Sequence, residues 1–264
     1  MKFKAGFIGC GNMGGALARA AAGAIGGENV AVCDNDSSKT TLLCSEYNIT
    51  ELTFEDMFSS CEFVFLGVKP QVMKDVLSPH IELINSSNAV VVTMAAALEM
   101  SYFENQLGIS RPIIRIMPNM PASVGQGMIL YDVNHLVTKE NITEFLEIMS
   151  HAGKLDILPE HLIDAGSAVS GCGPAFAFMF AEALADAGVE CGLPRDKAIM
   201  YAAQMLKGSA ELLLNEPSPA TLKDKVCSPG GTTIAGVHAL ENGAFRAAVI
   251  NAVTSAYKRT LELK

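Results

Sequence analysis

The segment CSPGGTT, residues 227–233, gathers two glycines and three hydroxyl side chains just before a helical pattern. Glycines leave backbone N–H groups uncovered, and the first N–H groups of a helix lack partners within it. Together with the positive end of the helix dipole, such groups form a binding site for a carboxylate or a phosphate. The same pattern also suits a plain turn in which Thr232 or Thr233 caps the helix, and the residues alone favour this simpler interpretation.

The segment GCGNMG, residues 9–14, is a second glycine-rich stretch, placed between a strand-like segment and a helical one. In a strand–turn–helix unit, the first glycine allows the tight turn and the second lets a pyrophosphate approach the backbone. The third lets the helix pack closely against the strand. This order of elements predicts a dinucleotide site formed by Gly9, Gly11, Asn12, Met13 and Gly14.

Asp34 lies 20 residues after Gly14, at the end of the second strand-like segment. An acid at this place accepts hydrogen bonds from the adenosine ribose hydroxyls, which favours NADH. The residues that follow, Ser37, Ser38 and Lys39, would instead suit the 2′-phosphate of NADPH. A third interpretation makes residues 34–36 a turn and a helix cap. The sequence therefore predicts NADPH or NADH as cofactor without choosing between them.

Residues at the ends of two later strands complete the predicted cofactor site. Val68, Lys69 and Pro70 follow one strand-like segment, and Ala95 ends another. Open α/β sheets bind ligands at the carboxyl ends of their strands, and small residues there leave room for a flat nicotinamide ring. Pro70 is also an ordinary helix start, and Lys69 is equally compatible with a solvated surface.

These segments belong to an alternating pattern over residues 1–158. Short runs that are rich in Val, Ile and Phe, and apolar on both faces, alternate with helical runs. This predicts an α/β fold, an N-terminal Rossmann domain with a doubly wound parallel sheet and crossover helices. We expect strands at 4–9, 30–34, 63–68, 89–95, 112–118, 127–132 and 155–159, and helices at 13–23, 71–84 and 139–151.

Residues 159–264 have a different composition, since strand patterns give way to Ala-rich helical ones. They predict a C-terminal all-helical domain. Its segment 174–188 is apolar nearly all round, so we expect it to be buried on most sides. The many Ala, Met and Phe residues of this domain suggest that part of its surface is hidden against a second subunit.

Composition excludes several other classes of protein. The formal charge is −9 without a basic cluster, so we expect no nucleic-acid partner. Seven cysteines without a Cys-x-x-Cys pair indicate reduced thiols in a cytoplasmic protein, and the five histidines lack metal-ligand spacing. The run 89–98 is about half a membrane span, so we expect no transmembrane helix and no membrane partner.

Several segments occur together in an order that resembles the pyrroline-5-carboxylate reductase family. They are IGCGNMGGA at 8–16, VKPQVM at 68–73, RIMPNMPA at 115–122, SGCGPAFAFMFAEALADAG at 170–188 and LKDKVCSPGGTTIAGVHALE at 222–241. The resemblance spans essentially the whole chain, and its last motif is long and specific. It implies an NAD(P)H-dependent oxidoreductase that reduces the C=N bond of 1-pyrroline-5-carboxylate to L-proline, the last step of proline biosynthesis.

The resemblance also assigns roles around the CSPGGTT segment. Gly230, Gly231 and Thr232 would bind the substrate carboxylate, with N–H donors from Gly231, Thr232 and Thr233. The Thr233 hydroxyl would face the ring nitrogen, and Ser228 would hold the loop or the substrate. Two more substrate-binding candidates are Ser170, which is otherwise a helix N-cap, and Glu216, which would reach the site across a dimer interface or else remain a solvated loop residue. The family further implies that the C-terminal helical domain, residues 159–264, is a dimerisation domain. The homodimer that it forms can assemble into a larger oligomer such as a decamer, and the family leans towards NADPH.

Two other functions remain open at this point. A 3-hydroxyacid dehydrogenase of similar build would place a catalytic lysine on the helix at 174–188, which contains none. A dinucleotide sensor without activity would not need a second anion site. For the imine reduction, catalysis is mainly positioning, with the donor and acceptor carbons held ~3–3.5 Å apart. Neither a metal nor a dedicated acid or base is expected.

Overall fold

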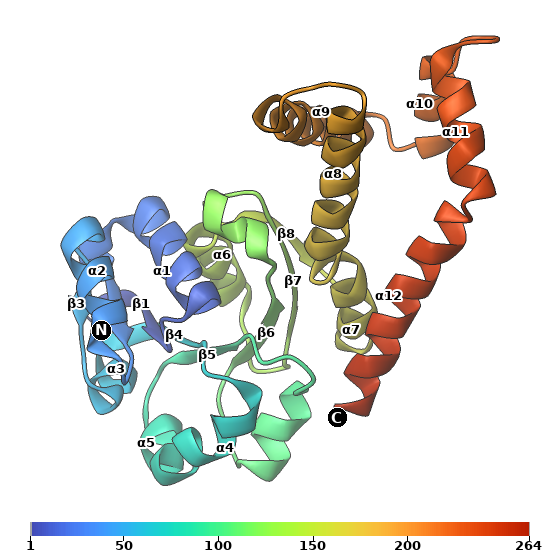
Figure 1. Ribbon diagram of the computed structural model, residues 1–264. Helices are drawn as coiled ribbons and strands as arrows, with labels where there is room; N and C mark the ends of the chain where they lie inside the picture. Colours follow the sequence, from blue (N-terminus) through green and yellow to red (C-terminus); the bar gives the residue numbers. More distant parts are fainter. Residues whose placement is uncertain (1, 264) are drawn as a thin grey trace. The chain divides into compact units, whose positions relative to one another are not determined.

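The structure is a computed structural model that describes residues 2–263 (Figure 1). Contacts within the chain divide it into two compact units, Met1–Cys172 together with Ala256–Lys264, and Gly173–Ser255. The first unit contains one eight-stranded sheet with helices on both of its faces, and the second is all-helical. The expected fold class, a Rossmann domain followed by a helical domain, is therefore confirmed.

The strands of the sheet follow the order β3-β2-β1-β4-β5-β6-β7-β8. The central β1 pairs with β2 on one side and with β4 on the other. The chain changes direction across the sheet at this point, which is where doubly wound sheets bind ligands. The strands are β1 Phe3–Ile8, β2 Val30–Cys33, β3 Thr50–Glu51, β4 Cys61–Leu66, β5 Val90–Thr93, β6 Ile113–Met117, β7 Gly127–Val133 and β8 Gly153–Ile157.

One pairing departs from the parallel sheet that the sequence predicts. β6 and β7 are antiparallel, whereas all other pairs are parallel. The connection between them, from Met117 to Gly127, holds only the short 3₁₀ helix η4, Met120–Val124. A parallel crossover needs a longer connection, so this one returns the chain in the opposite direction.

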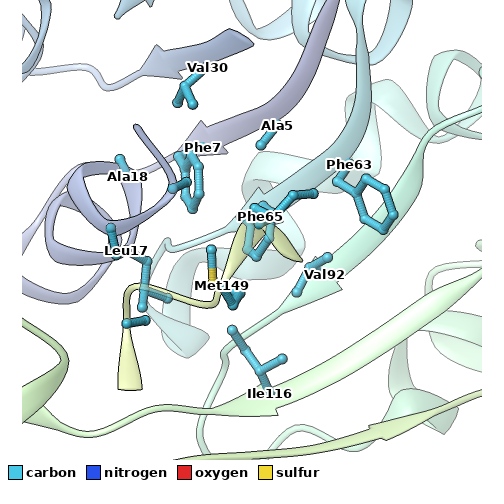
Figure 2. Packing of buried hydrophobic residues seen from close by; sticks show 14 of the residues in the cluster. Ala5, Phe7, Leu17, Ala18, Val30, Phe63, Phe65, Val92, Ile116 and Met149 are labelled. Carbon is cyan, nitrogen blue, oxygen red and sulfur yellow. The ribbon is translucent and has the colours of Figure 1, made fainter. Parts of the chain in front are cut away.

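Helices cover both faces of the sheet. Because side chains alternate along a strand, Phe7 of β1 and Phe65 of β4 share one face, and their rings stack with centroids 4.4 Å apart. Figure 2 shows them beside Leu17 and Met149, in the core that also receives α1 and α6. The opposite face packs on α3, α4 and α5. These helices are α1 Asn12–Ile25, α3 Phe54–Ser60, α4 Pro70–Leu77, α5 Ile81–Ser86 and α6 Lys139–Ile148.

Of the described segments before α7, there remain the α-helix α2, Ser37–Tyr47, the 3₁₀ turn η1, Gly27–Asn29, and the π-helical turn η3, Tyr102–Gln106. Neither α2 nor α3 was expected. The helix expected at 71–84 is divided into α4, the 3₁₀ turn η2, Ser78–His80, and α5. Pro79 explains the division, because it lacks the N–H group that a continuous helix would need.

α7, Glu160–Ser170, packs on β6 and β7 and is bound to the sheet by a buried arginine. Arg115 of β6 is fully buried, and its guanidinium donates to Asp164 at 2.8 Å and to Glu160 at 3.2 Å. The domain boundary expected between residues 158 and 159 lies where strands give way to helices. The division into compact units falls later, after Cys172, so α7 belongs to the first unit.

The second unit is built from α8 Gly173–Glu190, α9 Arg195–Asn215, α10 Pro219–Val226, α11 Thr232–Asn242 and the first part of α12 Phe245–Glu262. α8 packs against α9, and Phe180 of α8 contacts Phe245 of α12 with ring centroids 5.8 Å apart. Ala185 is the one described residue of α8 that is fully buried. The expectation that 174–188 is buried on most sides is therefore wrong for the single chain.

One segment, Glu160–Glu190, is long and apolar enough to cross a membrane by length and composition alone, which the sequence did not lead us to expect. It consists of α7 and α8. The first of these is not free to face lipid, because Ile163, Asp164 and Ala168 are buried against the sheet. A core or interface helix meets the same test of length and composition.

Candidate functional site

The loop between β1 and α1 depends on the absence of side chains at two of its glycines. Gly9 has φ of +90°, and a Cβ there would lie 2.8 Å from the backbone of Gly67. A Cβ on Gly14 would overlap with the carbonyl oxygen of Gly9. Gly11 differs, since a Cβ there would meet no described atom within 4 Å. The loop is therefore tightly packed on the protein side and open at its middle glycine.

α1 begins at this loop without a side-chain cap, because Gly11 occupies the N-cap position. In the part of the chain that the structure describes, the first-turn amides of Asn12 and Met13 have no acceptor. The positive end of the helix dipole adds to their attraction for an anion. The predicted residues of segment 9–14 thus form one loop that fits a pyrophosphate, and their contact with a cofactor remains a prediction.

Asp34 is held by the backbone of the same loop. Its Oδ2 accepts from the amide of Cys10 at 2.7 Å, and its Oδ1 accepts from the amide of Asp36 at 2.9 Å. Burial acts to raise the pKa of the Asp34 carboxyl, but these two hydrogen bonds and the nearby Lys39 outweigh it, so the pKa is lowered from 3.8. The carboxyl is therefore ionised at neutral pH. The interpretation of Asp36 as a helix cap is confirmed, since its side chain accepts from the amide of Ser38 at the start of α2.

A cavity of about 290 Å³ opens beside the loop, at the carboxyl ends of β1 and β2. Its walls include Gly9, Asp34, Asn35, Val68, Asp75 and His80. The sequence did not indicate Phe54 and His80, whose rings lie 4.3 Å apart in the cavity wall. They come from α3 and η2, and no local motif signals that two separate elements meet at a site.

The other predicted cofactor residues differ in how much of them a ligand can reach. Lys69 is the N-cap of α4, Pro70 is its first residue, and the Lys69 side chain is exposed. Val68 is half-buried in the cavity wall. The side chain of Ala95 lies in the core and the whole residue is only 1% exposed, so it offers almost no surface to a ligand. These four assignments also remain predictions.

In the second unit, Ser228–Gly231 forms a tight turn ahead of α11. The amide of Gly231 donates to the carbonyl of Ser228 at 3.0 Å, and Gly230 has φ of +66°. Proline followed by a left-handed glycine is typical of a type II turn. Because the turn uses the Gly231 amide, this group is not a free donor for a carboxylate, contrary to our expectation.

The start of α11 is open to solvent. Gly231 is its N-cap and no side chain caps the helix, so the simpler interpretation, in which Thr232 or Thr233 is the cap, is wrong. In the described part of the chain, the amides of Thr232 and Thr233 have no acceptor, and both residues are exposed. A Cβ on Gly231 would overlap with the Oγ of Ser228, so this hydroxyl packs where any other residue would place its side chain.

The two remaining substrate candidates are engaged in hydrogen bonds. Glu216 accepts from Lys225 at 2.7 and 2.8 Å, which ties the end of α9 to α10. Ser170 ends α7 rather than capping a helix start, and its hydroxyl donates to the carbonyl of Gly166. Its own carbonyl accepts from Asn119 at 2.8 Å, a contact that the sequence did not suggest.

The histidines and the possible metal ligands show no arrangement that indicates a catalytic role in the described residues. Within residues 2–263, no group of three or more His, Cys, Asp or Glu side chains has the arrangement of a metal site. His238 lies on α11 with its Nε2 3.1 Å from the Asn242 amide nitrogen, which is a contact between neighbouring helical turns.

Two family models match parts of the chain. The family described as pyrroline-5-carboxylate reductase dimerisation matches residues 160–263. The family described as NADP oxidoreductase, coenzyme F420-dependent, matches residues 4–97, which include the glycine-rich loop and Asp34.

Whole proteins are similar over nearly their full length. The pyrroline-5-carboxylate reductase of Escherichia coli (strain K12) is 39% identical over 267 residues, covering 100% of this chain and 99% of that protein. Among solved structures, a pyrroline-5-carboxylate reductase from Coxiella burnetii has a TM-score of 0.90 at 29% identity, covering 100% of this chain and 99% of that one. The Plasmodium falciparum pyrroline carboxylate reductase with NADP bound has a TM-score of 0.85 at 30% identity, covering 98% of both chains.

Proposed function

The chain belongs to the pyrroline-5-carboxylate reductase family. From this premise we propose that one of its two glycine-rich segments binds the cofactor and that the other binds the substrate. The protein is an NAD(P)H-dependent oxidoreductase that reduces the C=N bond of 1-pyrroline-5-carboxylate to L-proline, the last step of proline biosynthesis. The dinucleotide occupies the loop 9–14, in a cofactor-binding domain of residues 1–158. The imino acid occupies the turn 228–231 and the start of α11, in a substrate-binding domain of residues 159–264.

The open start of α11 is the observation that supports the substrate site. Two exposed amides, those of Thr232 and Thr233, lie without an acceptor in the described chain at the positive end of a helix. A substrate carboxylate supplies the acceptors that they lack. Gly230 contributes the left-handed backbone that shapes the turn. Ser170 and Glu216 remain predicted substrate-binding residues on the strength of the family motifs.

In the proposed mechanism the main role of the protein is to hold the cofactor and the substrate in the right relative position. When bound, the reduced nicotinamide supplies a hydride for the imine carbon. The amides of Thr232 and Thr233 fix the carboxylate and thereby the orientation of the ring. The hydroxyl of Thr233 accepts a hydrogen bond from the protonated ring nitrogen, which receives the electrons of the C=N bond and becomes the neutral amine of proline. This step uses no separate acid, because the nitrogen already carries its proton.

Replacing Gly231 tests whether the substrate and the cofactor occupy separate sites. In Gly231→Val the added side chain displaces Ser228 and covers the open amides, so we expect KM for the imine to rise by an order of magnitude or more, with KM for NAD(P)H nearly unchanged. The measurement is steady-state kinetics, followed by the absorbance of the reduced nicotinamide. Gly208→Val on α9, where a Cβ would meet no described atom within 4 Å, is the matched control.

Equal damage to both KM values in Gly231→Val would contradict separate sites. The same assay tests the reaction itself. Turnover of a 3-hydroxyacid with oxidised dinucleotide, and none of 1-pyrroline-5-carboxylate with either reduced dinucleotide, would overturn the proposed substrate.

We further propose that the protein is a cytoplasmic homodimer associated through its second unit. The match of residues 160–263 to a dimerisation family supports the association. The seven cysteines are all free thiols, which suits a reducing compartment.

A further inference from the structure

We propose that this chain selects NADH over NADPH, and that the carboxylate of Asp34 is the selecting group. The inference rests on the proposed placement of the dinucleotide on the loop 9–14. Asp34 directly follows β2 and lines the cavity beside Gly9. Its side chain is 11% exposed, so it is largely desolvated but still reachable from the cavity.

The orientation of this carboxylate is fixed by backbone groups. The amides of Cys10 and Asp36 donate to its two oxygens at 2.7 and 2.9 Å. Cys10 is part of the glycine-rich loop, so the carboxylate is fixed relative to the backbone proposed to bind the pyrophosphate. The adenosine ribose adjoins the pyrophosphate, and an acid at this place accepts hydrogen bonds from its hydroxyls. Oδ1 also accepts from Lys39 at 3.3 Å, whereas Oδ2 accepts only from Cys10 in the described structure and keeps a further lone pair for a ribose hydroxyl.

NADPH carries a 2′-phosphate where NADH has a hydroxyl, and the cavity is poorly suited to that charge. Its described lining contains Asp34 and Asp75 but no lysine or arginine. His80 also lines the cavity, but its ring Nδ1 lies 3.8 Å from a carboxylate oxygen of Glu55, so an acidic group already lies beside this ring. A phosphate beside Asp34 would therefore place two negative groups together, and such repulsion is an effective means of rejecting a ligand.

Two of the three residues that would offer a phosphate site, Ser38 and Lys39, already bind acidic side chains. Lys39 lies 3.3 Å from Asp34 and 3.7 Å from Asp36, so its single charge is shared between two acids. The hydroxyl of Ser38 donates to Asp36 at 2.6 Å, within the cap of α2. Binding a 2′-phosphate here would break these contacts. Since the Plasmodium falciparum relative has NADP bound, the shared fold does not reject that dinucleotide, and the choice depends on residues such as these.

Direct binding measurements on the full chain test the proposal without depending on turnover. Nicotinamide fluorescence gives Kd for NADH and for NADPH, and we expect NADH to bind at least about tenfold more tightly. Asp34→Asn removes the charge at nearly constant shape, and we expect it to reduce that preference about tenfold, mainly by tightening NADPH.

Two control variants separate Asp34 from its neighbours. Asp36→Asn removes the same charge one residue outside the described cavity lining and keeps a capping side chain, so it should retain the preference for NADH. Lys39→Ala removes the one cation that contacts Asp34 in the described structure, and it should not weaken NADH relative to NADPH. A selective loss of NADPH in this variant would instead identify Lys39 as a phosphate ligand and overturn the proposal.

Other results would also overturn it: equal or tighter binding of NADPH by the wild-type chain, or an unchanged preference in Asp34→Asn. A folded Asp34→Asn variant that loses both dinucleotides equally would do the same, with far-UV circular dichroism as the check on folding. Asp34→Ser provides a second substitution should the asparagine disturb the loop. If the wild-type chain binds neither dinucleotide, the placement on the loop 9–14 fails, which is distinct from failure of the preference.

Discussion

At the scale of single residues, the hydroxyl of Thr233 has the most specific assignment in the proposed mechanism. Thr233 is exposed and its side chain does not cap α11, so the fold gains little from it. We expect Thr233→Val to lower kcat by roughly ten- to a hundredfold, the usual effect of losing a hydrogen bond to a charged group. The free energy of unfolding should change by no more than about 0.5 kcal/mol.

Steady-state kinetics and urea denaturation measure these two effects on the same variants. Thr233→Ser should recover most of the rate, because it restores the hydroxyl. Thr254→Val on α12 is the matched control, since the Thr254 hydroxyl is bonded within its own helix to Ile250. A kcat for Thr233→Val equal to that of the wild-type protein would remove Thr233 from the mechanism.

The residues of this turn also show what a sequence can and cannot predict about a site. Proline followed by two glycines predicts a tight turn with a left-handed residue, and Gly230 has φ of +66°. Whether the next amide is free depends on the type of turn, and the Ser228 carbonyl takes the Gly231 amide. The bond between Glu216 and Lys225 joins different helices, so no local pattern reveals it.

At the scale of elements, α7 is held to the sheet by charges rather than by apolar packing alone. The Asp164 side chain is 4% exposed and that of Arg115 is 0% exposed. Removing one partner of a buried ion pair leaves the other charge without compensation, which typically costs 3–5 kcal/mol. We therefore expect Arg115→Met to destabilise the protein by about that amount, and Arg115→Met combined with Asp164→Leu to recover much of the loss.

Urea denaturation followed by circular dichroism measures these changes, at one fixed protein concentration because association alters apparent stability. The exposed pair of Arg259 and Glu262 provides the control, since Arg259→Met breaks a bridge worth at most ~1 kcal/mol. Similar losses in Arg115→Met and Arg259→Met would show that the buried pair does not anchor α7.

Elements with a strong pattern were predictable, and those without one were not. β1, α1 and β2 follow from apolar runs joined by a glycine-rich turn. β3 is only Thr50–Glu51, too short to carry a period, and α2 is largely polar. The antiparallel direction of β7 leaves no trace in its composition, because a buried strand is apolar whichever way it runs.

At the scale of the whole molecule, the second unit has more apolar surface than a single chain can bury. A groove of about 490 Å³ between α8, α11 and α12 is lined entirely by apolar side chains, and Met179 within it is 69% exposed. Soluble chains seldom leave such a surface uncovered. Contact with a second subunit through this groove would explain the apolar composition of α8, which burial within the single chain does not explain.

The proposed homodimer predicts that charging this groove separates the subunits. A glutamate at Met179 would have to be desolvated on association, so Met179→Glu should shift the protein towards monomer at concentrations where the wild-type chain is dimeric or larger. Light scattering after size-exclusion chromatography gives the mass, and it also distinguishes a dimer from a decamer. Leu42→Glu on α2, an equally apolar residue that is 54% exposed in the first unit, should leave the mass unchanged. A monomeric wild-type chain, or a Met179→Glu variant with the mass of the wild type, would mean that this groove is not where the subunits meet.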